Sequence, residues 1–200
     1  MASRQEGLWQ RVGDYWWVSQ EPGSRASLWT GKTDENGVEF SAEEADRYAW
    51  SAAFISYVMR VAGAGNRFPY SPAHATYINA ARMAVSGNET DAPPRDWAIV
   101  AQRPDDYAPR LGDLICTGRD QASGISFDDL PAQFPGHCDI VVAIQPGELS
   151  VIGGNVAAAV SMKHVPVTGN GRIADPNGVS LDDRYPWFVV LQVLYDQPGA

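Results

Sequence analysis

The chain has 200 residues, which is enough for one sizeable domain with a hydrophobic core of its own. Its formal net charge is -9, from 15 Lys and Arg against 24 Asp and Glu, and the basic residues are scattered. Nucleic acids and anionic membrane surfaces bind clustered Lys and Arg, so this balance argues against both as partners.

The first 20 residues lack the charged start and the apolar middle of a secretory signal peptide. No apolar run in the sequence approaches the length of a membrane span. The sequence leaves three alternatives open: a cytosolic protein, export by a route that needs no signal peptide, or a leader that was removed from this chain.

Residues 1–40 are rich in large aromatic side chains, namely Trp9, Tyr15, Trp16, Trp17 and Trp29. The pair Trp16-Trp17 fits a short strand as well as the end of a helix, and the sequence does not decide between them. We divide the single domain, residues 1–200, into this aromatic-rich N-terminal extension, 1–40, and a core, 41–195. One role open to the extension is to form a wall of a cleft.

The segment from Tyr48 to Ala62 is the element around which we expect the fold to be organised. Its apolar positions recur at three- and four-residue steps, which is typical of a helix with one buried face. These positions are Phe54, Ile55, Val58, Met59 and Ala62. Upstream, Ser41-Ala42-Glu43-Glu44 fits a capping box, which predicts a short helix leading toward the central one.

Two further segments complete the helical half. The loop 68–74 contains two prolines, and it precedes a helix that we expect from about residue 73 to residue 85. Residues 86–110 contain four prolines, which predicts an irregular surface connection with Trp97 and Ile99 tucked in.

From Leu111 onward the sequence changes to short apolar and β-branched runs bounded by turn residues. We expect strands at 112–116, 137–144, 149–152, 160–167 and 187–194, the second of them central and buried on both faces. Helices followed by a meander of strands indicate an α+β protein, in which the N-terminal helices pack on a central antiparallel β-sheet.

Ser51, near the start of the central helix, is a candidate nucleophile. The first turn of a helix presents N–H groups that no helical carbonyl accepts, so the backbone of Ser51 and Ala52 suits a developing oxyanion. Trp50 precedes the serine and is a candidate accessory residue. The alternative is that Ser51 serves only as an N-cap, a common role for serine.

The chain has three histidines, and each has a structural alternative. His137 begins a central strand at the rim of the sheet, where a general base can reach a nucleophile on a facing helix. The alternative is a strand-end histidine bonded to a backbone group. His74 lines a cleft or caps the helix that it precedes, and we favour the cap. His164 alternates outward on a late strand and is expected to face solvent.

Two residues are candidates to orient the imidazole of His137. Asn155 follows two glycines one strand later, and its amide can accept the ring N–H and fix the tautomer. Alternatively, Asn155 supplies the left-handed conformation of a tight bend. Asp139 lies on the same strand face as His137, so it too can orient the base, or else bond within its loop.

Cys116 and Cys138 stand at the ends of two expected strands. If these strands pair antiparallel, the sulfurs come within reach of a disulfide, which indicates an oxidising compartment; buried free thiols fit equally well. The adjacent His137 and Cys138 point to opposite faces of a strand, and no other His or Cys residues show ligand spacing. We therefore expect no metal and no cofactor.

Four motifs occur in one order over roughly residues 41–166. They are Trp50-Ser51-Ala52-Ala53-Phe54, Gly112-Asp113-Leu114-Ile115, Gly136-His137-Cys138-Asp139-Ile140 and Ile152-Gly153-Gly154-Asn155. The set resembles the papain-like cell-wall hydrolases, which are the NlpC-type endopeptidases and the CHAP amidases. In that superfamily the helix start carries a cysteine nucleophile and a Gly-His strand supplies the base. With the 68–74 segment, the set is similar to an outlying group of domains of unknown function.

The resemblance implies a papain-like fold and a peptidoglycan-directed amidase or endopeptidase, with Ser51, His137 and Asn155 as catalytic residues and cell-wall peptides as substrate. It implies action in the periplasm or outside the cell, as a remodelling enzyme or as a toxin with an immunity protein as partner. The departure is Ser51, because the superfamily has cysteine there and a hydroxyl is far less acidic than a thiol. Three explanations for this serine remain open. The protein is a serine hydrolase, or it is an inactive domain that binds a peptide or glycan, or the serine is an inactivating substitution.

Overall fold

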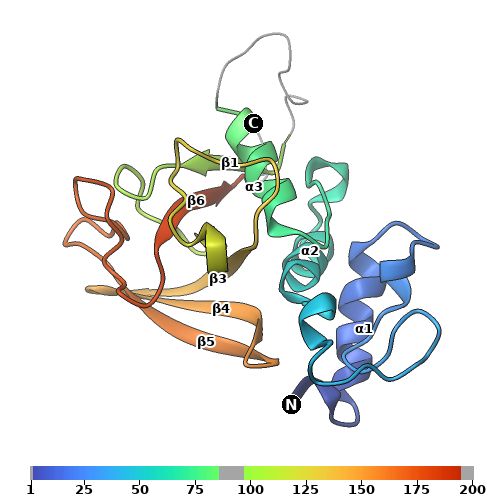
Figure 1. Cartoon of the computed structure of the whole chain (residues 1–200). Helices are drawn as coiled ribbons and strands as arrows, with labels where there is room; N and C mark the ends of the chain where they lie inside the picture. Colours follow the sequence, from blue (N-terminus) through green and yellow to red (C-terminus); the bar gives the residue numbers. More distant parts are fainter. Residues whose placement is uncertain (1, 86–96, 195–200) are drawn as a thin grey trace.

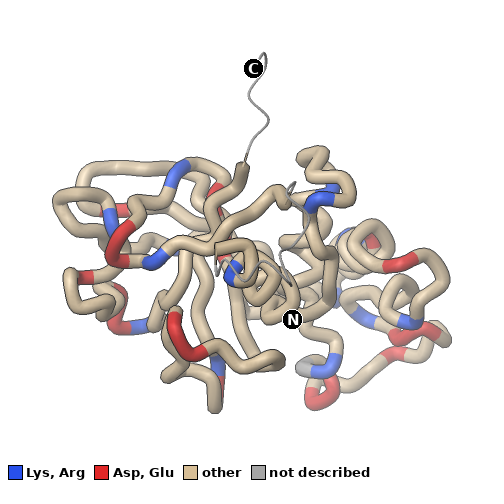
Figure 2. The backbone as a smooth tube through the Cα atoms, turned by 90° about the horizontal axis from the view of Figure 1, so that it is seen from above, with Lys and Arg blue, Asp and Glu red and all other residues tan. Residues whose placement is uncertain are grey.

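The computed structural model describes residues 2–85 and 97–194, and it is an α+β structure, as predicted (Figure 1). In these residues, three α-helices precede a six-stranded antiparallel sheet. None of the helices in the described ranges combines the length and apolar character that crossing a bilayer requires. Basic and acidic residues are scattered over the described backbone and do not gather in one region (Figure 2).

The helices are α1 (Leu8–Ser19), α2 (Ser51–Val61) and α3 (His74–Met83). The first of them resolves the ambiguity at the tryptophan pair, since both residues lie within α1. Consecutive helical residues point about 100° apart, so Trp16 is buried while Trp17 is 60% exposed. Tyr15 of α1 packs its ring against aromatic side chains at the N-terminal end and along one face of α2.

The central helix α2 is buried along most of its length, as its apolar periodicity predicts. Upstream, the capping box is present: the Ser41 hydroxyl accepts the Glu44 N–H while the Glu44 carboxylate accepts the Ser41 N–H. It leads into a single 3-10 turn, Ala45–Tyr48, and not into an α-helix. The prediction of a short helix at this point is therefore correct only as a turn.

The strands are β1 (Ile99–Gln102), β2 (Leu114–Gly118), β3 (Gly136–Gln145), β4 (Glu148–Val156), β5 (Ala159–Pro166) and β6 (Trp187–Val193). Their order in the sheet is β1-β6-β2-β3-β4-β5, with every neighbouring pair antiparallel. The last strand, β6, thus lies between β1 and β2, so strands that are far apart in the sequence are neighbours in the sheet.

Two strand predictions need correction. The expected irregular connection, residues 86–110, contains the edge strand β1, whose pairing with β6 its short sequence does not reveal; residues 86–96 lie outside the described residues. The expected full burial of β3 holds only for its first half, because Val142 and Ile144 are exposed. The second half of β3 runs into the turn toward β4, away from the helices (Figure 1).

The core has two parts, one on each face of the sheet. The larger part lies between the helices and the sheet, and the smaller part lies on the opposite face, around Ile115, Val151 and Trp187. Cys116 and Cys138 face each other across β2 and β3 and form a disulfide. This disulfide excludes the alternative of two free thiols.

Candidate active site

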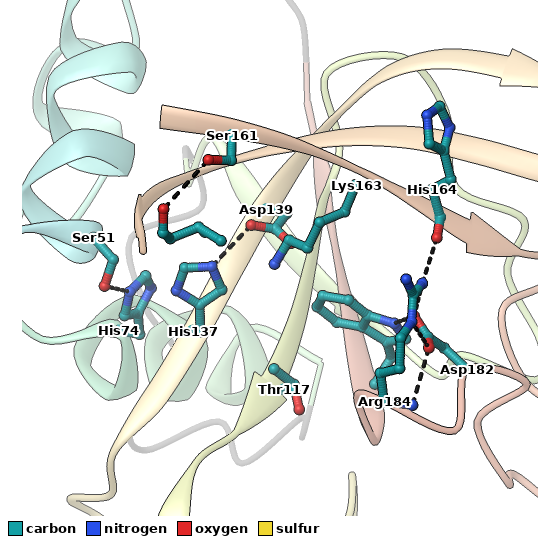
Figure 3. A network of polar contacts seen from close by, with 12 residues as sticks. Ser51, His74, Thr117, His137, Asp139, Ser161, Lys163, His164, Asp182 and Arg184 are labelled. Atoms are coloured by element: carbon teal, nitrogen blue, oxygen red, sulfur yellow. Dashed lines mark hydrogen bonds and ion pairs between the residues drawn. The ribbon is translucent and has the colours of Figure 1, made fainter. Parts of the chain in front are cut away.

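Ser51 is the first residue of α2 and is only 6% exposed. Its Oγ lies 2.7 Å from Nε2 of His74, within hydrogen-bond distance (Figure 3). The N-cap position of α2 is Trp50, so the serine does not serve as the helix cap. A hydroxyl in contact with an imidazole at a helix start is the arrangement of an activated nucleophile.

His74 is the first residue of α3, where its ring turns inward to Ser51. The predicted capping role is wrong, because the N-cap of α3 is Ala73 and no side chain caps the helix. One turn along α3, the Tyr77 hydroxyl contacts His74 Nδ1. Burial, followed by the nearby His137 and Arg119, holds the pKa of His74 well below its ordinary value of 6.5. The ring is therefore a neutral imidazole at neutral pH.

His137 and Asp139 stand on one face of β3, and both are fully buried. His137 Nε2 lies 2.9 Å from Asp139 Oδ1, so the carboxylate fixes the ring orientation and the tautomer. Burial lowers the pKa of His137, and the bond to Asp139 opposes that shift without cancelling it. The Nδ1 atom of His137 has no hydrogen-bond partner among the described residues.

The two pairs form one continuous cluster. The ring centroids of His74 and His137 are 5.5 Å apart, and the planes are tilted by 56°. In Figure 3, Ser51, His74, His137 and Asp139 follow one another across the view, from α2 and α3 into the sheet. The structure thus brings the predicted nucleophile and the predicted base into one site, with His74 as the histidine that contacts the serine.

Two glycines allow the sheet to approach this cluster. A Cβ atom placed on Gly153 would lie 1.8 Å from Asp139 Oδ1 and 2.8 Å from His137 Nε2. A Cβ atom on Gly154 would lie 2.6 Å from Cβ of Phe54 on α2. The double glycine of the fourth motif therefore has a packing role: any side chain here would displace the His137–Asp139 pair or the central helix.

Asn155 does not take the position expected of it. Asp139 is the residue that bonds to His137, whereas Asn155 has a φ of 57° at the irregular end of β4 and so supplies a left-handed bend. Its side chain lines a small cavity together with Trp50 and Ala158. The predicted contact of Asn155 with the histidine is replaced by that of Asp139.

Trp50, which precedes Ser51 in the chain, borders two cavities of the described residues. This tryptophan is almost fully buried and packs against Tyr15, with ring centroids 5.7 Å apart. A second cavity, of about 320 Å³, is lined by Trp50, Tyr15 and Val160, among other residues of α1 and β5. Because Ser51 and His74 are nearly inaccessible, a substrate carbonyl reaches the hydroxyl only if neighbouring side chains move.

The first N–H groups of α2 lie outside the hydrogen-bond ladder of the helix. The first hydrogen bond of α2 joins the Phe54 N–H to the Trp50 carbonyl. The N–H groups of Ser51 and Ala52 come before it, so no helical carbonyl accepts them. The predicted oxyanion donors therefore lie at the positive end of the helix dipole.

Lys163 belongs to this site, although the sequence did not predict it. Its Nζ lies 2.5 Å from Asp139 Oδ2, so it forms an ion pair on the side of the carboxylate opposite His137. The missed signal is the alternation along β5, which puts Lys163 on the same inward face as the buried Val165. His164 points the other way, is exposed, and pairs with Glu148, which confirms the prediction that it faces solvent.

Within residues 2–85 and 97–194, no three His, Cys, Asp or Glu side chains gather as metal ligands. That no cofactor is needed stays a prediction.

Residues 3–193 match the model of a family described as an uncharacterized protein conserved in bacteria (DUF2272). The match includes the aromatic-rich N-terminal residues as well as the sheet. No curated protein and no solved structure matches the chain.

Proposed function

The chain belongs to this bacterial family, DUF2272, and we propose that it is an amide hydrolase with Ser51 as nucleophile and His74 as general base. The observation that carries the proposal is the 2.7 Å contact between Ser51 Oγ and His74 Nε2 at the start of a buried helix. A general base must lie within hydrogen-bond reach of the proton that it removes, and His74 meets this condition.

The proton transfers follow from the neutral state of His74. The Ser51 hydroxyl donates to Nε2, which places the ring proton on Nδ1, facing the Tyr77 hydroxyl oxygen. As Oγ bonds to the substrate carbonyl carbon, its proton moves to Nε2, and the imidazolium then protonates the departing amine. Water, deprotonated by the same nitrogen, hydrolyses the acyl ester and releases Ser51.

The remaining residues position the site. The N–H groups of Ser51 and Ala52 donate to the oxyanion of the tetrahedral intermediate. His137 is held by Asp139 and packs against His74, so it limits how that ring can turn. The role first assigned to His137 as proton acceptor passes to His74 in this proposal, while Trp50 and Asn155 line a small separate cavity.

The proposed substrates are peptides of the bacterial cell wall, and the proposed fold relationship is to the papain-like hydrolases. Support comes from the order of the four motifs and from a nucleophile helix packed on a strand that carries Gly136-His137. The Cys116–Cys138 disulfide supports action in an oxidising place, such as the periplasm or the exterior of the cell. An immunity protein as partner belongs to the same proposal.

A second candidate is a non-catalytic domain that binds a peptide or glycan beside Trp50. The burial of Ser51 and His74 favours it, since a buried, hydrogen-bonded serine–histidine pair can be purely structural.

The test is to incubate the protein with cell-wall fragments and to detect new amine and carboxyl ends by mass spectrometry. We expect cleavage by the native protein, none by Ser51→Ala, and a loss of roughly 10²–10⁴-fold in rate for His74→Gln. The matched control is Ser56→Ala, because Ser56 is a buried serine of the same helix that donates to the Ser71 carbonyl and not to a histidine.

Three outcomes are decisive. If neither the native protein nor Ser51→Cys cuts any fragment, the hydrolase proposal fails and the binding domain stands. If only Ser51→Cys cuts, the serine is the disabling change. If His137→Gln abolishes cleavage while His74→Gln keeps it, the proton acceptor is His137.

A further inference from the structure

Lys163 is a buried cation that the proposed reaction does not itself use. The residue is 9% exposed, and its ammonium group lies 4.6 Å from the ring centroid of Tyr185 and 5.5 Å from that of Trp187. Beyond the ion pair with Asp139, neither Nζ nor Asp139 Oδ2 has a hydrogen-bond partner in the described residues. Burying an ion pair costs desolvation energy that the attraction does not always recover, so stability alone is a weak reason for this lysine.

The charges around the two histidines suggest another reason. The charged and titratable groups around the His137–Asp139 pair are Lys163 on β5, His74 and Tyr77 on α3, and Arg119 just after β2. Asp139 favours a proton on His137, whereas Lys163 and Arg119 disfavour it. A proton on His137 would in turn disfavour one on His74, whose ring lies 5.5 Å away.

We propose that Lys163 is a positioning residue of the Ser51 site: its ion pair with Asp139 keeps His137 uncharged, so that His74 accepts the serine proton. This inference rests on the proposed function. The lysine, the carboxylate and a neutral His137 together carry no net charge. Without the lysine, the buried carboxylate attracts a proton onto the His137–Asp139 pair, and a second proton on the adjacent His74 is opposed.

The first test is a pH titration of the histidines, monitored by NMR, which needs no substrate. The chain has only three histidines, and the exposed His164 is an internal control. In Lys163→Met we expect the His137–Asp139 pair to take up its proton at higher pH than in the native protein, and Lys163→Arg to restore the native titration. An unchanged His137 resonance in Lys163→Met over the same pH range would overturn the inference.

A second variant protects the test against misfolding. Lys163→Met leaves a buried carboxylate without its cation, which is a strongly destabilising change. The double variant Lys163→Met with Asp139→Asn removes both charges, so His137 should stay neutral to low pH as in the native protein. If His137 in the double variant still takes up its proton at higher pH than in the native protein, the uncompensated Asp139 carboxylate is not what draws the proton in Lys163→Met, and the inference fails.

The activity profile separates this inference from the proposed function. With a cleavable substrate, Lys163→Met should lose more kcat/KM at acidic than at alkaline pH, which moves the acidic limb of the profile to higher pH; a uniform loss at all pH values would indicate a structural role only. If the titration shifts but no variant cleaves a substrate, the charge assignment holds and the hydrolase proposal fails.

Discussion

Substitution of Gly153 by alanine tests how the sheet and the site fit together. A Cβ atom there would overlap Asp139 Oδ1, at 1.8 Å, and crowd His137 Nε2, at 2.8 Å. The backbone of Gly153 does not have a positive φ, so alanine is compatible with the strand conformation and the effect is steric. The only relief is to separate the histidine from the carboxylate or to shift β4.

Both effects reduce stability. Overpacking a buried position costs about 1–3 kcal/mol, and losing a buried hydrogen bond to a charged group costs about 1.5–3 kcal/mol. We therefore expect Gly153→Ala to lower the free energy of unfolding by about 2.5–6 kcal/mol, measured by urea denaturation. The His137 ring resonances should shift in the same variant, because its partner moves.

The matched control is Gly169→Ala. No atom lies within 4 Å of a Cβ placed on Gly169, and its φ is not positive. Its unfolding free energy should stay within about 0.5 kcal/mol of the native value, as is usual for surface substitutions. Equal stability of Gly153→Ala and Gly169→Ala, with unchanged His137 resonances, would refute the packing of β4 against the His137–Asp139 pair.

Two further predictions concern stability. Burial lowers the pKa of His74 and of His137 below 6.5, so the unfolded chain binds more protons below that pH. The free energy of unfolding should therefore fall as the pH drops from 6.5 toward 5, by up to about 1.4 kcal/mol per pH unit for each histidine. Urea denaturation should show a smaller slope of stability against pH for His74→Gln; a pH-independent native stability would contradict this. The disulfide joins residues 22 positions apart, so Cys116→Ser with Cys138→Ser should cost about 3 kcal/mol, and equal urea midpoints would show that the cross-link adds nothing.

Much of the fold could be predicted because the signals are local. The apolar spacing from Phe54 to Met59 marks α2, and the β-branched run after His137 marks β3. Strand β1 was missed because its four residues, Ile99–Gln102, are too few to show a period. The pair Trp16-Trp17 was ambiguous because two adjacent aromatic residues fit either kind of element.

The site was predictable only within single elements. Asp139 stands two residues from His137, so the strand period alone places both side chains on one face. The contact of Ser51 with His74 joins α2 to α3, and that of Lys163 with Asp139 spans β5 and β3 across the intervening β4. Neither contact can be predicted from the spacing of residues along the chain.

The sequence by itself determined that α2 and α3 are helices and that β2 to β6 are strands, where Ser51 stands on its helix, and that Asp139 lies beside His137. Only the tertiary structure decided that His74 meets Ser51, that the two cysteines join, and that Lys163 balances Asp139. The physical reason is that side-chain direction within an element follows its repeat. Which elements lie against one another depends instead on strand order and on close approaches such as the one that Gly153 permits.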